Sequence, residues 1–103
     1  MTEIARLHRE LVDRIVGGDA RASRELRLAA FDNAGLDEPM ATLIDKVAHH
    51  SYQVTDDDVA AVRTAGLSED QIFETMVCAA VGAADRQYKS AFAAFAEATG
   101  GRR

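Results

Sequence analysis

The side chains able to do chemistry in this sequence are few and scattered. Cys78 is the only cysteine among 103 residues, and Glu74 lies one helical turn before it. A carboxylate at that position can take a proton from the thiol, but its negative charge also raises the thiol pKa. No lysine or arginine lies within the preceding turn to stabilise a thiolate. Two interpretations remain open: a lone peroxidatic thiol, or a small side chain at a helix contact.

His50 is the third candidate for acid–base work, after Cys78 and Glu74. His49 and Asp45 lie four residues apart, a spacing at which one helix can offer two ligands to a metal ion. Two ligands do not complete a site, so a solvated helix face explains this pair better. We therefore expect no metal and no cofactor. His8 has no candidate partner nearby in the sequence.

These residues must be positioned by helices, because the composition favours no other element. Hydrophobic residues make up 48% of the chain and aromatic residues only 6%, since alanine supplies much of the apolar content. Alanine is the best helix former, and seven glycines and one proline leave few helix breakers. We expect one all-α domain over residues 1–103, with N-terminal helices in 1–35 and a core over 36–99.

Apolar spacing and punctuation divide the chain into about five helices. We expect them over about 2–16, 20–31, from about 37, over about 56–65 and over about 69–98. In the first, an apolar stripe recurs at three- and four-residue spacing: Ile4, Leu7, Leu11 and Ile15. The last would be roughly 45 Å long, which exceeds the width of a domain of this size.

The same helix-start signal occurs twice in the second half of the chain. Thr55 and Asp58 form a capping box, and Ser68 and Gln71 form another. In each case apolar residues flank the box at the positions of a hydrophobic staple, namely Val54 with Val59 and Leu67 with Ile72. Capping also explains the acidic run at 56–58, which lacks the alternating ligands of a calcium loop.

Two sides of the last helix can be distinguished. The expected core stripe comprises Phe73, Met76, Val77, Ala80, Ala84, Tyr88, Ala91 and Phe95. Another side, mostly of small residues, comprises Thr75, Ala79, Gly82, Arg86 and Ala93. Glycine inside a helix costs roughly 1 kcal/mol relative to alanine unless something packs there. We take the small side as a candidate subunit interface; the alternative is a set of good helix formers exposed to water.

Charge and targeting signals exclude several classes of protein. The net charge is −5, and six arginines in residues 1–32 are matched by six acidic residues, so no nucleic-acid surface is expected. The N-terminus has no apolar signal-peptide core, and no apolar run approaches the ~20 residues of a membrane span. We expect a cytoplasmic protein, and the preference for Arg over Lys suggests a bacterial source. The thin core of so small a chain favours a homo-oligomer.

A family resemblance becomes visible in the segment VTDDDVAAVRTAGLSEDQIFETMVCAAVGAA. Its residues at 57–59, 65–68 and 72 resemble the short helix, Ala-Gly-Leu-Ser turn and long helix of carboxymuconolactone decarboxylase-like and alkylhydroperoxidase-D-like proteins. The resemblance covers about half the chain. It implies an alkylhydroperoxidase-D-like bundle that assembles into trimers or hexamers, with a separate catalytic partner subunit as an option.

The redox motif of that family is missing. Redox members carry a Cys-x-x-Cys pair and a following histidine one helix upstream of the Ala-Gly-Leu turn. Counting back from Gly66 places the pair at 51–54, where Ser51 and Val54 stand, and the histidine at Asp58. The chemistry needs an attacking thiolate and a resolving thiol, which these residues cannot supply. Alternatively, the segment corresponds to the cysteine-free second half of a longer family member; the dithiol is missing either way.

Two functions of different class follow. The first is an oligomeric accessory or assembly domain without dithiol peroxidase activity, which the missing motif favours. The second is an enzyme that acts on a small, partly apolar peroxide or lactone in a pocket between helices or subunits, with Cys78, Glu74 or His50 as its acid, base or thiol. Nothing in the sequence brings an acid, a base and a nucleophile together, so we favour the first.

Overall fold

The computed structural model describes residues 2–100, which form five α-helices and one short 3-10 helix and contain no strand. The elements are α1 (Thr2–Gly17), α2 (Arg24–Asp32), α3 (Met40–His49), η1 (Ser51–Gln53), α4 (Asp56–Thr64) and α5 (Glu69–Gly100). The predicted all-α fold with a long C-terminal helix is confirmed. None of these helices is long and apolar enough to cross a membrane.

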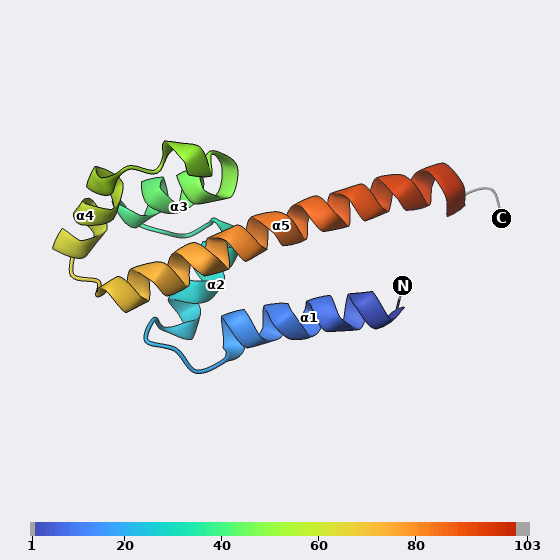
Figure 1. Ribbon diagram of the computed structural model, residues 1–103, viewed down its shortest axis with the longest axis horizontal. Helices are drawn as coiled ribbons and strands as arrows, with labels where there is room; N and C mark the ends of the chain where they lie inside the picture. The colour runs from blue at the N-terminus through green and yellow to red at the C-terminus, as the bar shows by residue number, and fades with distance from the viewer. Residues whose placement is uncertain (1, 101–103) are drawn as a thin grey trace.

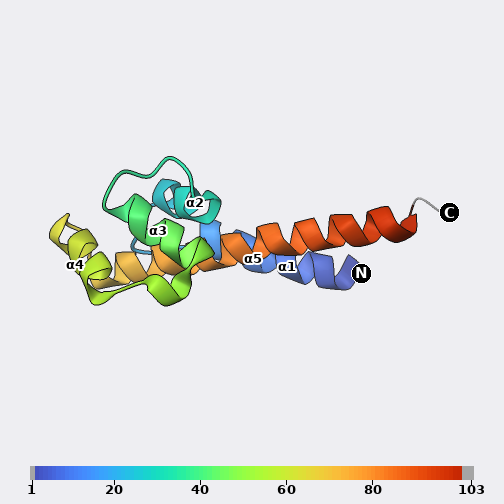
Figure 2. The same cartoon turned by 90° about the horizontal axis from the view of Figure 1, so that it is seen from above.

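Helix α5 is the longest helix, and the other helices lie along it (Figure 1). Helices α2, α3 and α4 gather around its N-terminal half, while α1 runs antiparallel to it on another side (Figures 1 and 2). The principal extents are 55 × 28 × 20 Å. The distal part of α5 extends past this body, and every residue over 89–99 is exposed.

The core lies where α2 and α3 cross the N-terminal half of α5. Its fully buried members include Leu43 and Ile44 of α3, Val62 of α4 and Ala79 of α5. The closest approach is at Gly82, where an added Cβ would overlap the backbone carbonyl of Phe31 at the end of α2. Glycine is required at this position because the two helix backbones meet there.

Local capping chemistry sets the starts of α4 and α5 as the sequence predicted. Thr55 Oγ1 accepts from the Asp58 amide (3.3 Å) while the Asp58 carboxylate accepts from the Thr55 amide (2.9 Å). Ser68 Oγ accepts from the Gln71 amide (3.1 Å) while Gln71 Oε1 accepts from the Ser68 amide (2.8 Å). Asp58 also receives Lys46 Nζ at 2.9 Å, which ties α4 to α3.

The starts of α2 and α3 fall later than predicted. Helix α2 begins at Arg24, whereas the sequence predicted a start at about residue 20 with Asp19 as its N-cap. The N-cap is instead Ser23, whose Oγ accepts from the Leu26 amide. Helix α3 begins at Met40. The serine could have been identified as a cap, but the weak apolar stripe of α2 gave no register to choose between the two.

The predicted orientation of α5 is wrong. Thr75, Ala79 and Gly82 of the small-residue side are buried within the chain, so they form no subunit interface, whereas Arg86 and Ala93 of that side are exposed. Most of the expected core stripe points outward instead: Phe73 is 68% and Phe95 64% exposed, and Ala80, Ala84 and Ala91 are exposed as well. Met76 of that stripe does pack against the core. Small side chains let α2 approach closely, and that close approach fixed which side of α5 faces the body.

The apolar stripe of α1 is also largely outside the core. Ile4, Leu7 and Leu11 are exposed, and only Ile15 packs against the core cluster. The inward contacts of α1 come from a neighbouring side of the helix, through His8. The side of α1 that faces α5 carries Ala5, His8 and Val12, while three large apolar side chains of α1 stay exposed.

Candidate functional site

Cys78 lies in the core, where α5 meets the end of α1 and the start of α2. Its side chain is 1% exposed, and Sγ lies 3.8 Å from the Ile15 carbonyl oxygen. Burial raises the pKa of the Cys78 thiol; the positive charge of Arg27 opposes this, and Glu74 adds to it. Without access and with a raised pKa, the thiol fits the interpretation of a small side chain at a helix contact.

The cation beside Cys78 comes from another helix and was missed in the sequence. Arg27 is buried, and it donates to the carbonyl oxygens of Ala22 (3.2 Å) and Ile15 (3.0 Å). These carbonyls lie at the two ends of the α1–α2 connection. The guanidinium therefore holds that connection on the core and satisfies its backbone oxygens.

Glu74 of α5 binds the same α1–α2 connection through its side chain. Its carboxylate accepts from the backbone amides of Arg21 (3.2 Å) and Ala22 (2.7 Å). Both oxygens are used in these bonds, so the side chain is held one turn from Cys78 as an acceptor for backbone amides. The geometry gives Glu74 a positioning role in the loop.

His50 does not join the other two candidates. It is exposed directly after α3, with its ring edge-on to Tyr52 at 6.0 Å between centroids. Within residues 2–100 no hydrogen bond, ion pair or ring contact links it to Cys78 or Glu74. The three predicted site residues therefore do not form one site.

The candidate metal pair is an exposed ion pair. His49 Nε2 lies 3.8 Å from Asp45 Oδ1, and both side chains are more than half exposed. No third His, Cys, Asp or Glu joins a pair to make a metal-binding group anywhere in the described part of the chain.

His8 has a partner that the sequence did not reveal. Its Nε2 donates to Asp85 Oδ1 at 2.6 Å, and Lys89 Nζ lies 3.2 Å from Asp85 Oδ2. Burial alone would raise the pKa of Asp85, but the hydrogen bonds and charges of His8 and Lys89 outweigh it and lower that pKa. The His8 ring also packs against Tyr88 at 5.1 Å. Asp85 is thus the anchor that holds α1 to α5.

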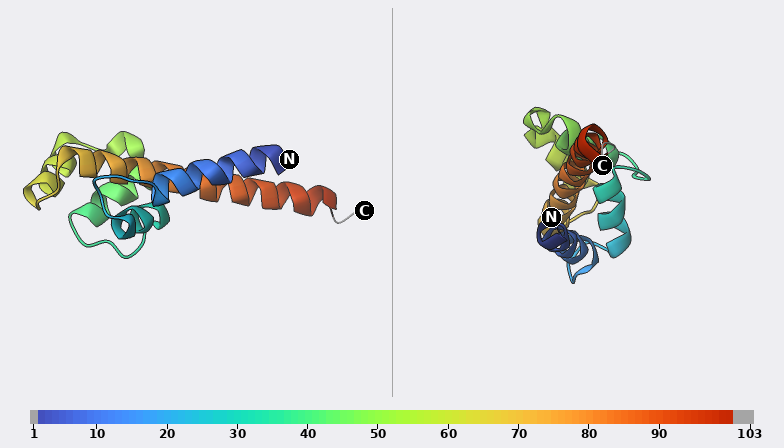
Figure 3. Two further views of the ribbon diagram at one scale, coloured as in Figure 1. Left: turned by 90° about the horizontal axis from the view of Figure 1, so that it is seen from below. Right: turned by 90° about the vertical axis from the view of Figure 1, so that its right-hand side faces the viewer.

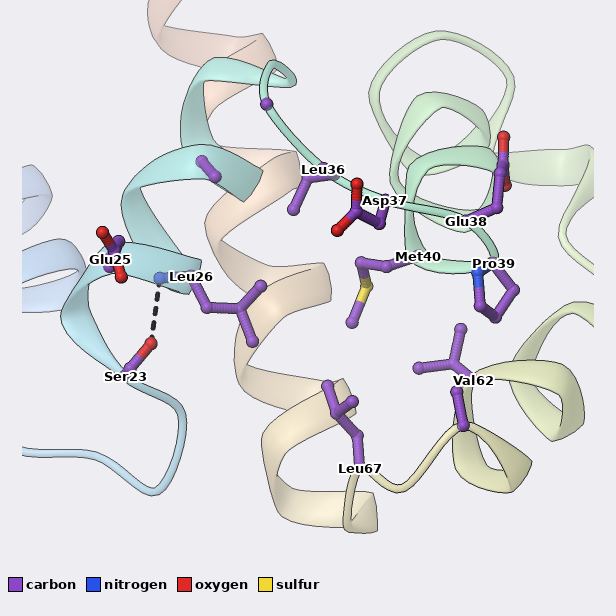
Figure 4. A pocket seen from close by; sticks show the side chains of 13 residues that line it. Ser23, Glu25, Leu26, Leu36, Asp37, Glu38, Pro39, Met40, Val62 and Leu67 are labelled. Atoms are coloured by element: carbon purple, nitrogen blue, oxygen red, sulfur yellow. Dashed lines mark hydrogen bonds between the residues drawn. The ribbon is translucent and has the colours of Figure 1, made fainter.

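A cleft lies between α2, the loop before α3, and the ends that join α4 to α5 (Figure 4). It has a volume of about 360 Å³. Leu26, Leu36, Met40 and Leu67 converge on it from four segments (Figure 4). All its ionisable lining residues are acidic: Glu25, Asp37 and Glu38. Glu38 is held by the Thr42 amide and hydroxyl.

An unusual surface is the outer face of α5, which we define as Phe73, Val77, Ala80, Ala84, Tyr88, Ala91 and Phe95. At 3.6 residues per turn these lie opposite the buried side of the helix. No charged residue between 73 and 95 lies on that side of α5. In the end-on view of Figure 3, α2 covers one side of α5, and the opposite side is open between α1 and the α3–α4 layer.

No known protein family, curated protein or solved structure matches the chain. The outer face of α5 departs from an ordinary protein surface because it carries no charged residue between 73 and 95.

Proposed function

We propose that this chain is an assembly domain that forms homo-oligomers through the outer face of α5 and carries out no dithiol chemistry. The observation behind the proposal is the charge-free outer face itself. A solvent-facing helix side normally carries charged residues, whereas this one exposes two phenylalanines and several alanines over its whole length.

The size of the exposed surface supports the proposal. A compact monomer of 11.1 kDa exposes about 5,700 Å². This chain exposes 6925 Å². The excess of about 1,200 Å² is larger than the ~800 Å² that each partner buries in a standard interface. The radius of gyration, 15.7 Å, likewise exceeds the ~13 Å of a compact chain of this length.

The proposal that the chain carries out no dithiol chemistry rests on its single cysteine, Cys78. A single cysteine cannot form and resolve an intramolecular disulfide, and Cys78 is buried. Membership of the alkylhydroperoxidase-D-like proteins, and with it a bacterial, cytoplasmic setting, trimers or hexamers and a separate catalytic partner, is part of the proposal. The order of short helix, Ala-Gly-Leu-Ser turn and long helix supports it.

The mass of the protein in solution tests the proposal. Sedimentation equilibrium of the parent should give a defined oligomer at micromolar concentration, and Ala84→Glu should give a monomer, because it places a charge in the middle of the outer face. Ala93→Glu is the matched control: it makes the same change on the same helix away from that face, and the oligomer should persist. A monomeric parent would refute the proposal.

A second candidate function is the binding of a small, partly apolar ligand in the cleft of Figure 4. The favouring observation is the pairing of an apolar interior with two carboxylates, Glu25 and Asp37, that have no side-chain partner within residues 2–100. Clefts of a few hundred Å³ with few polar groups are typical ligand sites.

The expected ligand is an apolar amine. Hexylamine should bind in calorimetry and hexanoate should not, and Glu25→Gln with Asp37→Asn should weaken binding; equal binding of both ligands would exclude this function.

A further inference from the structure

We infer that two copies of the chain pair antiparallel along α5, with the two-fold axis beside Ala84. In this pair, Phe95 of each copy lies in a cleft next to Phe73 of the other copy. The inference rests on the proposed function, and it specifies the partner and the register. Its first support is the pattern of the outer face. Phe73 and Phe95 each lie eleven residues from Ala84, and Val77 and Ala91 each lie seven.

That pattern suits a two-fold interface. In an isologous pair the same surface serves both copies, so each residue contacts the residue that lies the same distance on the other side of the axis. Reversal about Ala84 places each phenylalanine opposite a phenylalanine of the partner. Ala84 at the axis is small, so the two helices can approach closely there. Tyr88, which packs on His8 of α1, lies opposite Ala80 of the partner, and the phenylalanines meet at the ends.

A cleft of about 210 Å³ is present where the antiparallel register needs one. It lies between α4 and α5, beside Phe73. Its apolar lining is Val59, Ile72 and Met76, and the ion pair of Arg63 with Glu69 (3.1 Å) lines it as well. Phe95, 22 residues further along the same helix, is 64% exposed on the distal segment. The chain thus carries both a largely exposed aromatic side chain and a partly apolar cleft to receive it, about 33 Å apart along α5.

Shape favours the antiparallel pair over a parallel one. Glu69 and Asp70 at the start of α5 pair with Arg63 (3.1 Å) and Arg21 (3.8 Å) of the same chain, so their charges do not decide between the two arrangements. Helices α2, α3 and α4 lie only along the N-terminal half of α5 (Figure 1). In the antiparallel pair this group of three helices lies beside the exposed distal part of α5 of the other copy. A hexamer with three-fold and two-fold axes contains such pairs, and a cyclic trimer does not.

Cysteine cross-linking tests the register. Because Cys78 is buried, the parent should give no covalent dimer on mild oxidation. Ala84→Cys should cross-link with itself at the axis. Phe73→Cys and Phe95→Cys should each fail alone and should cross-link when the two variants are refolded together. Self-cross-linking of Phe73→Cys would show a parallel pair and overturn the inference.

Spin labels provide a measurement that leaves both phenylalanines in place. A nitroxide on Ala98→Cys should show a separation near 42 Å between copies in the antiparallel pair, since each label lies fourteen residues from the axis. A separation below about 15 Å, the side-by-side spacing of parallel helices with their labels, would overturn the inference. An oligomer by mass with either contrary result leaves the assembly function standing and refutes only this register; a monomer refutes both.

Discussion

The Cys78 thiol illustrates how position decides reactivity at the residue scale. Its sulfur lies against the Ile15 carbonyl, and burial raises its pKa. We predict that an aromatic disulfide reagent modifies the native protein at least 100-fold more slowly than the protein in urea, since modification requires opening of the core. The time course of thiolate release at pH 8 measures this. Equal rates in the two conditions would mean that the thiol is accessible.

Gly82 is the residue on which the packing of α2 against α5 depends most directly. Alanine at this position would normally favour the helix by roughly 1 kcal/mol. Here its Cβ overlaps the Phe31 carbonyl, so the helices must move apart. We predict that Gly82→Ala lowers the free energy of unfolding by about 3 kcal/mol in urea denaturation. Gly100→Ala, where a Cβ meets nothing within 4 Å, should cost less than about 0.5 kcal/mol.

Residue contacts across long sequence separations were beyond sequence analysis. The neighbours of Cys78 were predicted from its own helix, whereas Arg27 comes from α2 and Ile15 from α1. His8 and Asp85 are separated by 77 residues, and no local pattern pairs a histidine with a distant carboxylate. The capping boxes of α4 and α5 span three residues each and were predicted correctly for that reason.

At the scale of elements, the attachment of α1 depends on Asp85. Its folded-state pKa is lowered by His8 and Lys89 against the effect of burial, so it stabilises the fold above the unfolded value of about 3.9. This contribution is lost as pH falls through the lower, folded pKa. The attachment of α1 should therefore weaken on the acid side.

Asp85→Asn tests this attachment. We predict a loss of about 2 kcal/mol at pH 7, because charge-assisted hydrogen bonds are removed. The difference between variant and parent should shrink as the pH falls below about 3.9 and through the lowered folded-state pKa of Asp85, where the parent loses the same charge. Hydrogen exchange should rise first in α1. Asp13 is an exposed residue of α1 that lines, with His8 and Asp85, a cleft between α1 and α5. Asp13→Asn is the control and should leave exchange in α1 unchanged.

The positions of the helices were predicted from the sequence, but the side of each helix that packs against the rest of the molecule was not. Helical periodicity locates an apolar side on α5, and it does not say whether that side meets the body or another molecule. Thr75, Ala79 and Gly82 show the missing consideration: a side of small residues allows closer packing than one of large residues. The same ambiguity affects α1, where Ile4 and Leu7 are exposed although their spacing is typical of a core.

At the scale of the whole molecule, many apolar side chains of this chain lie on the outer face of α5 and on α1 and are not buried. The hydrophobic core is therefore smaller than the hydrophobic content of the sequence would allow. The sequence indicated a thin core and an overlong last helix, but not which surface remains uncovered, because that depends on how the helices pack. A chain of this shape gains stability when a second copy covers α5.

Mass action provides the corresponding prediction. If unfolding is coupled to dissociation of a dimer, each tenfold rise in protein concentration should raise the melting temperature by about 4 °C. We expect this slope for the parent and for Ala93→Glu over 5–500 μM (a range of about two decades) in calorimetry. Ala84→Glu should melt at a lower temperature that does not depend on concentration, because it unfolds as a monomer. A concentration-independent melting temperature for the parent would mean that the outer face of α5 stays exposed to solvent.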